Sequence, residues 1–170
     1  MISNIQLTST IDKWIDIIDQ FSFDQLLQKP DKESWSIGQV AMHIHTETSY
    51  YLMQVEQCLS NYENSNGSMK DEGKQMFENN SFPDIRIQRG HNLSQDYPQP
   101  ESKEDLKSRF LELKKQLGEA LDRISSINRS GKTQHPGLGY FNAKEWLQFA
   151  EMHMRHHLGQ VDRIIKNNNH

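Results

Sequence analysis

Apolar residues recur every three or four positions in four separate stretches of the chain. Positions with this spacing lie on one side of an α-helix, so each stretch predicts an amphipathic helix with one face toward a core. The predicted helices span residues 9–27, 36–61, 102–127 and 142–166. No stretch has the alternating pattern that is typical of a strand, and no segment repeats. The pattern therefore predicts an all-α fold.

Polar residues mark where these helices are expected to begin. A Ser, Thr, Asn or Asp side chain can accept a hydrogen bond from the first turn, and a Glu or Gln three residues later can bond back to it. The expected caps and their partners are, in chain order, Ser9 or Thr10, Ser36 with Gln39, Ser102 with Asp105, and Asn142 with Glu145. The first helix should end near Leu27, because the residue before Pro30 disfavours the helical conformation.

Residues 64–100 separate the second and third predicted helices and form the least regular part of the chain. They are rich in Asn, Ser, Gly, Asp and Glu, although a short helix is expected around residues 70–77. Connections this long are uncommon in a compact domain, and they are usually either functional or a crossover that wraps over the bundle. We therefore expect a single domain over residues 1–170, a four-helix bundle with a long crossover between helices 2 and 3. His91 is interpreted as a surface residue, and residues 131–139 as a turn-rich break.

Composition excludes several classes of protein. The net charge of −4 at pH 7 and the absence of a basic patch argue against a nucleic-acid-binding protein. Cys58 is the only cysteine, so no intrachain disulfide can form, and its place in an apolar helical pattern indicates a buried thiol. No apolar run approaches the roughly 20 residues needed to span a bilayer, and no signal peptide is visible. We expect a soluble, cytoplasmic protein with no membrane partner.

Two histidines in the fourth predicted helix stand out. His153 and His157 are four residues apart and fall at the centre of that helix's apolar stripe. Buried imidazoles must be hydrogen-bonded, paired or bound to a metal, since an unsatisfied buried polar group is costly. The pair is interpreted as half of a metal site, with an ordinary pair of core histidines as the alternative. A zinc protease is disfavoured, because Met154 stands where its H-E-x-x-H motif needs Glu.

The second predicted helix offers two further histidines. His43 and His45 lie on opposite flanks of the inward stripe of that helix. Glu47, one turn after His43, shares the side of His43. Helical periodicity alone therefore does not choose which of the two histidines completes a metal site.

Two stretches resemble the signatures of a known family. Lys29-Pro30 followed by W-S-I-G-Q-V-A-M-H over residues 35–43 resembles the second-helix signature of the DinB-like (damage-inducible) metalloproteins, and H-M-R-H-H-L-G-Q-V over residues 153–161 resembles the fourth-helix signature. The resemblance implies a four-helix bundle with a long crossover, commonly a homodimer. It also implies a divalent metal ion, often zinc or nickel, held by one histidine of helix 2 and two of helix 4. Carried over to this sequence, the ligands are His43, His153 and His157.

Three imidazoles would leave a coordination position open, as catalytic zinc sites do. Glu47 and Gln160 lie about one turn from a ligand and are candidates for orienting a bound group or for acid–base catalysis. Characterised relatives include transferases that use a low-molecular-weight thiol such as bacillithiol, mycothiol or glutathione. The resemblance thus implies a metal-dependent S-transferase, or a hydrolase, acting on a small electrophilic substrate in detoxification or stress response. The alternative is a non-catalytic metal-binding or stress-response protein.

Overall fold

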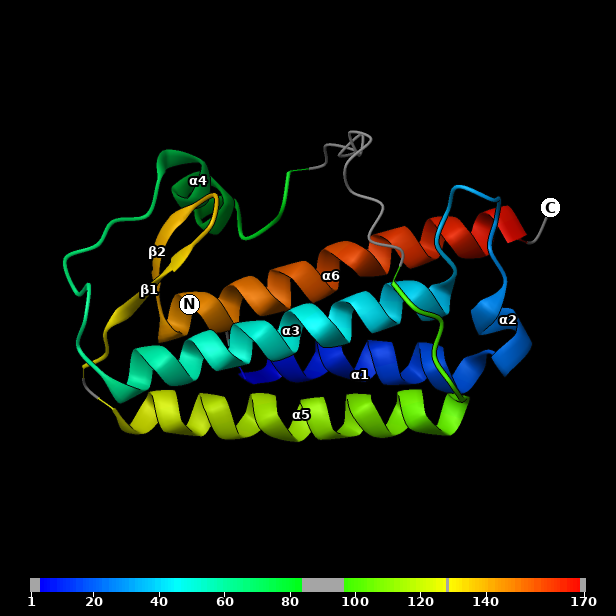
Figure 1. Ribbon diagram of the computed structural model, residues 1–170, viewed down its shortest axis with the longest axis horizontal. Coiled ribbons are helices and arrows are strands. Elements are labelled where there is room, and N and C mark those ends of the chain that lie inside the picture. Colours follow the sequence, from blue (N-terminus) through cyan, green and yellow to red (C-terminus); the bar gives the residue numbers. More distant parts are fainter. Residues whose placement is uncertain (1–3, 84–96, 128, 169–170) are drawn as a thin grey trace.

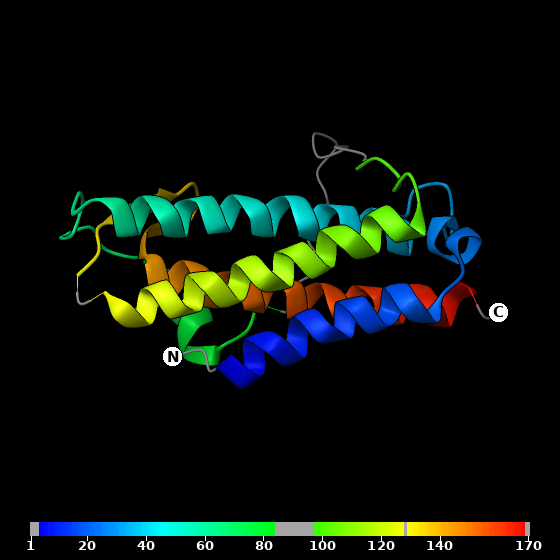
Figure 2. The same ribbon diagram turned by 90° about the horizontal axis from the view of Figure 1, so that it is seen from below.

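Four long helices lie side by side along the long axis of the molecule (Figures 1 and 2). The computed structural model describes residues 4–83, 97–127 and 129–168. The long helices are α1 (Asn4–Gln20), α3 (Ile37–Ser60), α5 (Lys103–Ser126) and α6 (Ala143–Asn168). Within the bundle α3 packs along α6, and α1 packs along α5. The predicted all-α bundle with a crossover between its second and third long helices is confirmed.

The apolar stripes of the four helices meet in one core. Its largest fully buried side chains include Trp14 of α1, Phe110 of α5 and Trp146 of α6. The indole Nε1 of Trp14 donates a hydrogen bond to the carbonyl oxygen of Met154 at 3.1 Å, so the buried polar atom of this side chain is satisfied across the bundle. Burial of these aromatic and aliphatic side chains supplies most of the stabilisation of the fold.

The first predicted helix is wrong in its boundaries. Instead of one helix over residues 9–27, the chain forms α1 and a separate short helix, α2 (Phe23–Leu27). Neither Ser9 nor Thr10 is a cap, since both lie inside α1. The break has a local cause, because Ser22 and Gln25 form a reciprocal capping box that starts α2. The continuous apolar spacing of this stretch concealed that box.

The other three predicted helix starts are confirmed. Ser36 and Gln39 form a reciprocal capping box before α3, and the Oγ of Ser102 accepts a hydrogen bond from the first turn of α5. At the start of α6, Asn142 and Glu145 bond to each other's backbone N–H, at 2.9 and 2.7 Å. These interactions span three residues, which is why they can be read from sequence.

A small β-hairpin precedes α6, where the sequence predicted only a turn-rich break. Its strands, β1 (Lys132–His135) and β2 (Gly139–Asn142), pair antiparallel. The expectation of no strands is therefore wrong. The two strands were missed because four residues are too few to show an alternating pattern. Segment 61–70 supports the hairpin, and Met69 forms a β-bridge with Gly139. Gly139 has φ +89°, and a side chain there would meet the carbonyl oxygen of Ser68.

The crossover contains the expected short helix, α4 (Asp71–Asn79), and its described end crosses the first turn of α3 before α5 begins. Residues 84–96, which include His91, lie outside the described residues. Where the chain resumes, Gln39 Nε2 donates to the carbonyl oxygen of Tyr97 at 2.7 Å. Pro100 then packs so closely on Gly38 that a Cβ there would lie 2.9 Å from the proline ring. The return segment is thus fixed to the first turn of α3.

Cys58 is buried, as its position in the apolar pattern predicted. Burial raises the pKa of its thiol, which fits a structural residue rather than a nucleophile. None of the helices in the described part of the chain is long and apolar enough to cross a membrane.

Candidate metal centre

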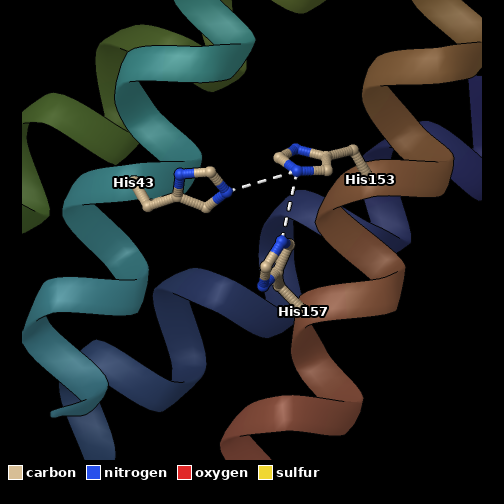
Figure 3. Close-up of side chains that lie close together, drawn as sticks. All are labelled: His43, His153 and His157. Carbon is tan, nitrogen blue, oxygen red and sulfur yellow. Dashed lines mark hydrogen bonds between the residues drawn. The ribbon is translucent and has the colours of Figure 1, made fainter. Parts of the chain in front are cut away.

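Three imidazoles meet between α3 and α6 (Figure 3). The Nε2 atom of His43 lies 3.3 Å from Nε2 of His153, which in turn lies 3.1 Å from Nε2 of His157. Among the described residues these three form the one group of His, Cys, Asp or Glu side chains whose potential ligand atoms all lie within 4.8 Å of one another. We call this group the histidine triad. The structure therefore brings together all three residues that the family resemblance implied as ligands.

Two helices position the triad. His153 and His157 project from the same face of α6, one turn apart, because four residues complete slightly more than one turn. His43 projects toward them from the early part of α3, which runs alongside α6. His153 is only 8% exposed. Its burial and the neighbouring histidines lower the pKa of His153 well below the ordinary value, so its imidazole stays neutral and able to act as a ligand.

Two of the spacings among the three nitrogens fit the ligands of a metal ion. Zinc–nitrogen bonds of about 2.0–2.1 Å at the tetrahedral angle place two ligand nitrogens roughly 3.3–3.4 Å apart. The two Nε2–Nε2 distances in the triad, 3.3 and 3.1 Å, lie close to this value. Imidazole is also a ligand that zinc and nickel accept readily.

Hydrogen bonding among the imidazoles cannot satisfy the triad by itself. A neutral imidazole nitrogen carries either one proton or one lone pair, so Nε2 of His153 can serve only one of its two neighbours. The Nδ1 atom of His157 lies 2.7 Å from Oε1 of Gln160, which is an acceptor. His157 must therefore be protonated on Nδ1, and its Nε2 presents a lone pair to the triad. Gln160, predicted as a site residue, thus orients His157 and sets its tautomer.

The second predicted supporting residue, Glu47, also lies beside the triad. Its Oε1 accepts a hydrogen bond from the hydroxyl of Tyr97 at 3.0 Å, and its Oε2 accepts one from Tyr51 at 3.3 Å. Burial, followed by the charge of Glu47, raises the pKa of Tyr51, so this phenol remains a donor. We call Glu47, Tyr51 and Tyr97 the Glu47 bracket.

Aromatic rings surround the triad. The ring of Tyr97 lies 4.8 Å from that of His43, and the ring of Trp35 lies 5.4 Å from it. Tyr51 and Phe82 each approach His153 to 5.7 Å between ring centres. None of these aromatic residues was predicted from sequence as part of the site. Tyr51 could have been found by its spacing of four from Glu47, but no local signal links Tyr97 to a residue 50 positions away.

Two other histidines are not members of the triad, although the ring of His156 lies 5.3 Å from that of His157. His45 faces the opposite side of α3 and lines a surface groove of about 640 Å³ between α3 and α5, next to Arg109. Burial, and then the charge of Arg109, lowers the pKa of His45. His156 packs on Phe82 with 5.4 Å between ring centres. Of the two histidines on α3, His43 is thus the one that reaches the α6 pair.

The fold and site together define a helical bundle with a three-histidine candidate metal centre between its second and fourth long helices. The sequence profile of the DinB superfamily matches residues 6–161, which is nearly the whole chain. The protein belongs to the DinB superfamily, as the two signature stretches implied. No curated protein matches the chain.

Proposed function

We propose that the histidine triad binds a divalent metal ion, with zinc or nickel the expected metal, and that the protein is a metal-dependent S-transferase. The observation that carries the proposal is the convergence of three histidine side chains, with two of the Nε2–Nε2 distances at the spacing of tetrahedral ligands. A divalent ion with three imidazole ligands keeps a position open, where it lowers the pKa of a bound thiol or water. The helix signatures resemble those of the DinB-like family, and thiol-using transferases among the characterised relatives of that family support a thiol as the co-substrate.

The residues around the triad fit this reaction. Gln160 holds His157 in the tautomer that turns a lone pair inward. Glu47 is held beside the triad by two phenols, where it can orient the incoming thiol or take up its proton. The thiol sulfur forms the new bond to the electrophilic carbon, and the leaving group departs with the bonding electron pair. Surrounding aromatic rings provide an apolar environment for a small electrophile.

The same site suits two variants of the proposal. With water in place of the thiol, the protein would be a hydrolase, and Glu47 would then serve as the base. A non-catalytic metal-binding protein is the alternative from another class. It is less well supported, because structural zinc sites have four protein ligands, whereas three converge among the described residues. The homodimer that the resemblance implies and the cytoplasmic location expected from the sequence belong to this proposal as well.

Metal content is the first test. We expect elemental analysis of protein purified without an affinity tag to find about one zinc, nickel or similar ion per chain. His157→Ala should lose this ion, and His45→Ala should retain it, because His45 lies on the other side of α3. A full complement of metal in His157→Ala would contradict the assignment of the triad.

Thiol transfer is the second test. Metal-loaded and chelator-treated protein would be incubated with a small electrophile, such as an aryl halide, and a panel of low-molecular-weight thiols. We expect thioether formation only in the metal-loaded sample, and only with some of the thiols. Stoichiometric metal without turnover of any thiol or of ester substrates would favour the non-catalytic alternative.

A further inference from the structure

The Glu47 bracket places a fixed negative charge beside the triad. Both carboxylate oxygens accept a phenol hydrogen bond, at 3.0 Å from Tyr97 and 3.3 Å from Tyr51. An ionised carboxylate can accept about four hydrogen bonds. Two acceptor positions therefore remain for donors that are not phenols.

Two separate elements hold the bracket. Tyr51 follows Glu47 by one turn of α3, so the two side chains share a face. Tyr97 comes from the return segment of the crossover, where its carbonyl oxygen is held by Gln39 at 2.7 Å. A carboxylate fixed from two sides loses little conformational entropy when a ligand binds, so it is preorganised for recognition.

The two tyrosine rings of the bracket also border the histidine triad. The ring of Tyr97 lies 4.8 Å from that of His43, and the ring of Tyr51 lies 5.7 Å from that of His153. Trp35 adds a third ring, at 5.3 Å from Tyr97. A carboxylate that keeps two acceptor positions next to these rings is a suitable partner for an ammonium group, which forms charge-assisted hydrogen bonds with it.

We propose that the Glu47 bracket binds the ammonium group of the thiol substrate, which would be an aminothiol. This inference rests on the proposed function, because it assumes that the sulfur of the same molecule is held at the triad. A divalent ion alone would repel a nearby ammonium, and the Glu47 carboxylate offsets that repulsion. Glu47 then has an orienting role, since an aminothiol bound as ammonium and thiolate has already lost its sulfur proton.

Cobalt-substituted protein provides a test that does not depend on turnover. Thiolate binding to Co²⁺ gives a charge-transfer absorption, which would be titrated with cysteamine, 2-mercaptoethanol and 3-mercaptopropionate to obtain dissociation constants. We expect the preference for cysteamine over 2-mercaptoethanol to fall by about tenfold in Glu47→Gln relative to the unmodified protein. The preference over 3-mercaptopropionate should fall by more, because Glu47 also repels a carboxylate.

Comparing ratios of dissociation constants removes the differences between the thiols in their own affinity for cobalt. The intrinsic affinity of each thiol for cobalt, including chelation through its amine, is the same for the unmodified protein and Glu47→Gln and therefore cancels. Tyr97→Phe, which removes one hydroxyl and keeps the ring, should reduce the preference for cysteamine by a smaller factor. Glu56→Gln is the matched control, because this α3 glutamate lines the groove on the α5 side, and the preference should not change.

The possible outcomes distinguish the aminothiol inference from the thiol-transfer proposal on which it rests. Equal preferences in the unmodified protein and Glu47→Gln would overturn the aminothiol inference and leave the thiol proposal standing. Bound cobalt with no thiolate band for any of the three thiols would overturn both. If Glu47→Gln does not fold, an unchanged preference in Tyr97→Phe would overturn the inference.

Discussion

Glu151 and His153 are two residues apart on α6 and both are almost fully buried, at 0% and 8% exposure, but the protein satisfies their polar atoms differently. Glu151 accepts hydrogen bonds from Thr10 and Gln6 of α1 and from two nitrogens of Arg155, at 2.7–3.2 Å. The Nε2 atom of His153 lies near the Nε2 atoms of both His43 and His157 but can form a hydrogen bond with only one of them. The Nδ1 atom of His153 has no hydrogen-bond partner among the described residues.

The difference separates a structural polar cluster from a candidate binding site. The Glu151 carboxylate is completed by donors from its own chain, so it joins α1 to α6 without help from a ligand. The Nε2 atoms of the triad lie 3.1 and 3.3 Å apart in succession, a spacing at which a divalent cation could complete the site. Two buried polar residues on the same helix can thus have opposite roles, and the same substitution at each should reveal this.

The largest expected effect is on metal affinity in His153→Leu. This change removes the central ligand of the triad, so we expect metal affinity to fall by about 1,000-fold or more. The unfolding free energy of the metal-free protein should stay the same or rise, because leucine fills the site without an unsatisfied polar atom. Isothermal titration with zinc and urea denaturation would measure the two quantities, and a large loss of stability without metal would contradict the comparison.

Glu151→Leu should give the opposite result. It removes four hydrogen bonds and leaves Arg155, whose side chain is 36% exposed, without its carboxylate. We expect the unfolding free energy to fall by about 3 kcal/mol, at the low end for broken buried ion pairs because Arg155 can reach water. Zinc stoichiometry in the folded fraction should remain at the unmodified level, and loss of zinc at full helicity would show that the two clusters are coupled.

A smaller effect is expected from Gln160→Ala. The substitution removes the acceptor for Nδ1–H of His157 and leaves all three ligands in place. Loss of such a supporting hydrogen bond typically lowers metal affinity by about 10- to 100-fold. Competition with a chromophoric zinc chelator would measure the change, and Gln116→Ala on the exposed side of α5 serves as the control. An unchanged affinity would show that Gln160 does not orient His157.

The smallest effect concerns His135, a half-buried histidine of the hairpin that is satisfied by backbone. Its Nδ1 accepts hydrogen bonds from the N–H groups of Gly137 and Leu138, at 3.1 and 3.2 Å. Burial lowers the pKa of His135, partly opposed by the charge of Glu47. As the pH falls, His135 is therefore protonated in the unfolded chain before it is protonated in the folded protein. The stability that the neutral histidine contributes is present above the ordinary pKa of 6.5 and is lost as the pH falls below it.

His135→Asn should make stability less dependent on pH. An asparagine Oδ1 can accept the same backbone hydrogen bonds, but it does not titrate. We expect the unfolding free energy of the metal-free variant to fall less steeply than that of the unmodified protein between about pH 7 and pH 5. Urea denaturation at several pH values would show this, and identical slopes would exclude His135 as a contributor.

Short-range features of this protein were predictable from sequence. Helical stripes, the capping pairs Ser36–Gln39 and Asn142–Glu145, and the spacing of His153 and His157 all depend on residues within four positions of each other. Backbone geometry alone fixes such relationships, so they hold before any tertiary contact forms. The errors at Ser22 and in the hairpin have the same origin, because weak local signals there were hidden by a continuous apolar pattern or by very short strands.

Sequence by itself thus determined the bundle class and the face of α6 on which two imidazoles lie. Periodicity left His43 and His45 as alternatives, and the packing of α3 against α6 brings His43 to the pair. Tertiary structure alone placed Tyr97 over His43 and surrounded Glu151 with donors from α1. These partners are between 54 residues (Tyr97 and His43) and 145 residues (Glu151 and Gln6) apart in the chain. Their meeting depends on how whole helices pack, which no local pattern encodes.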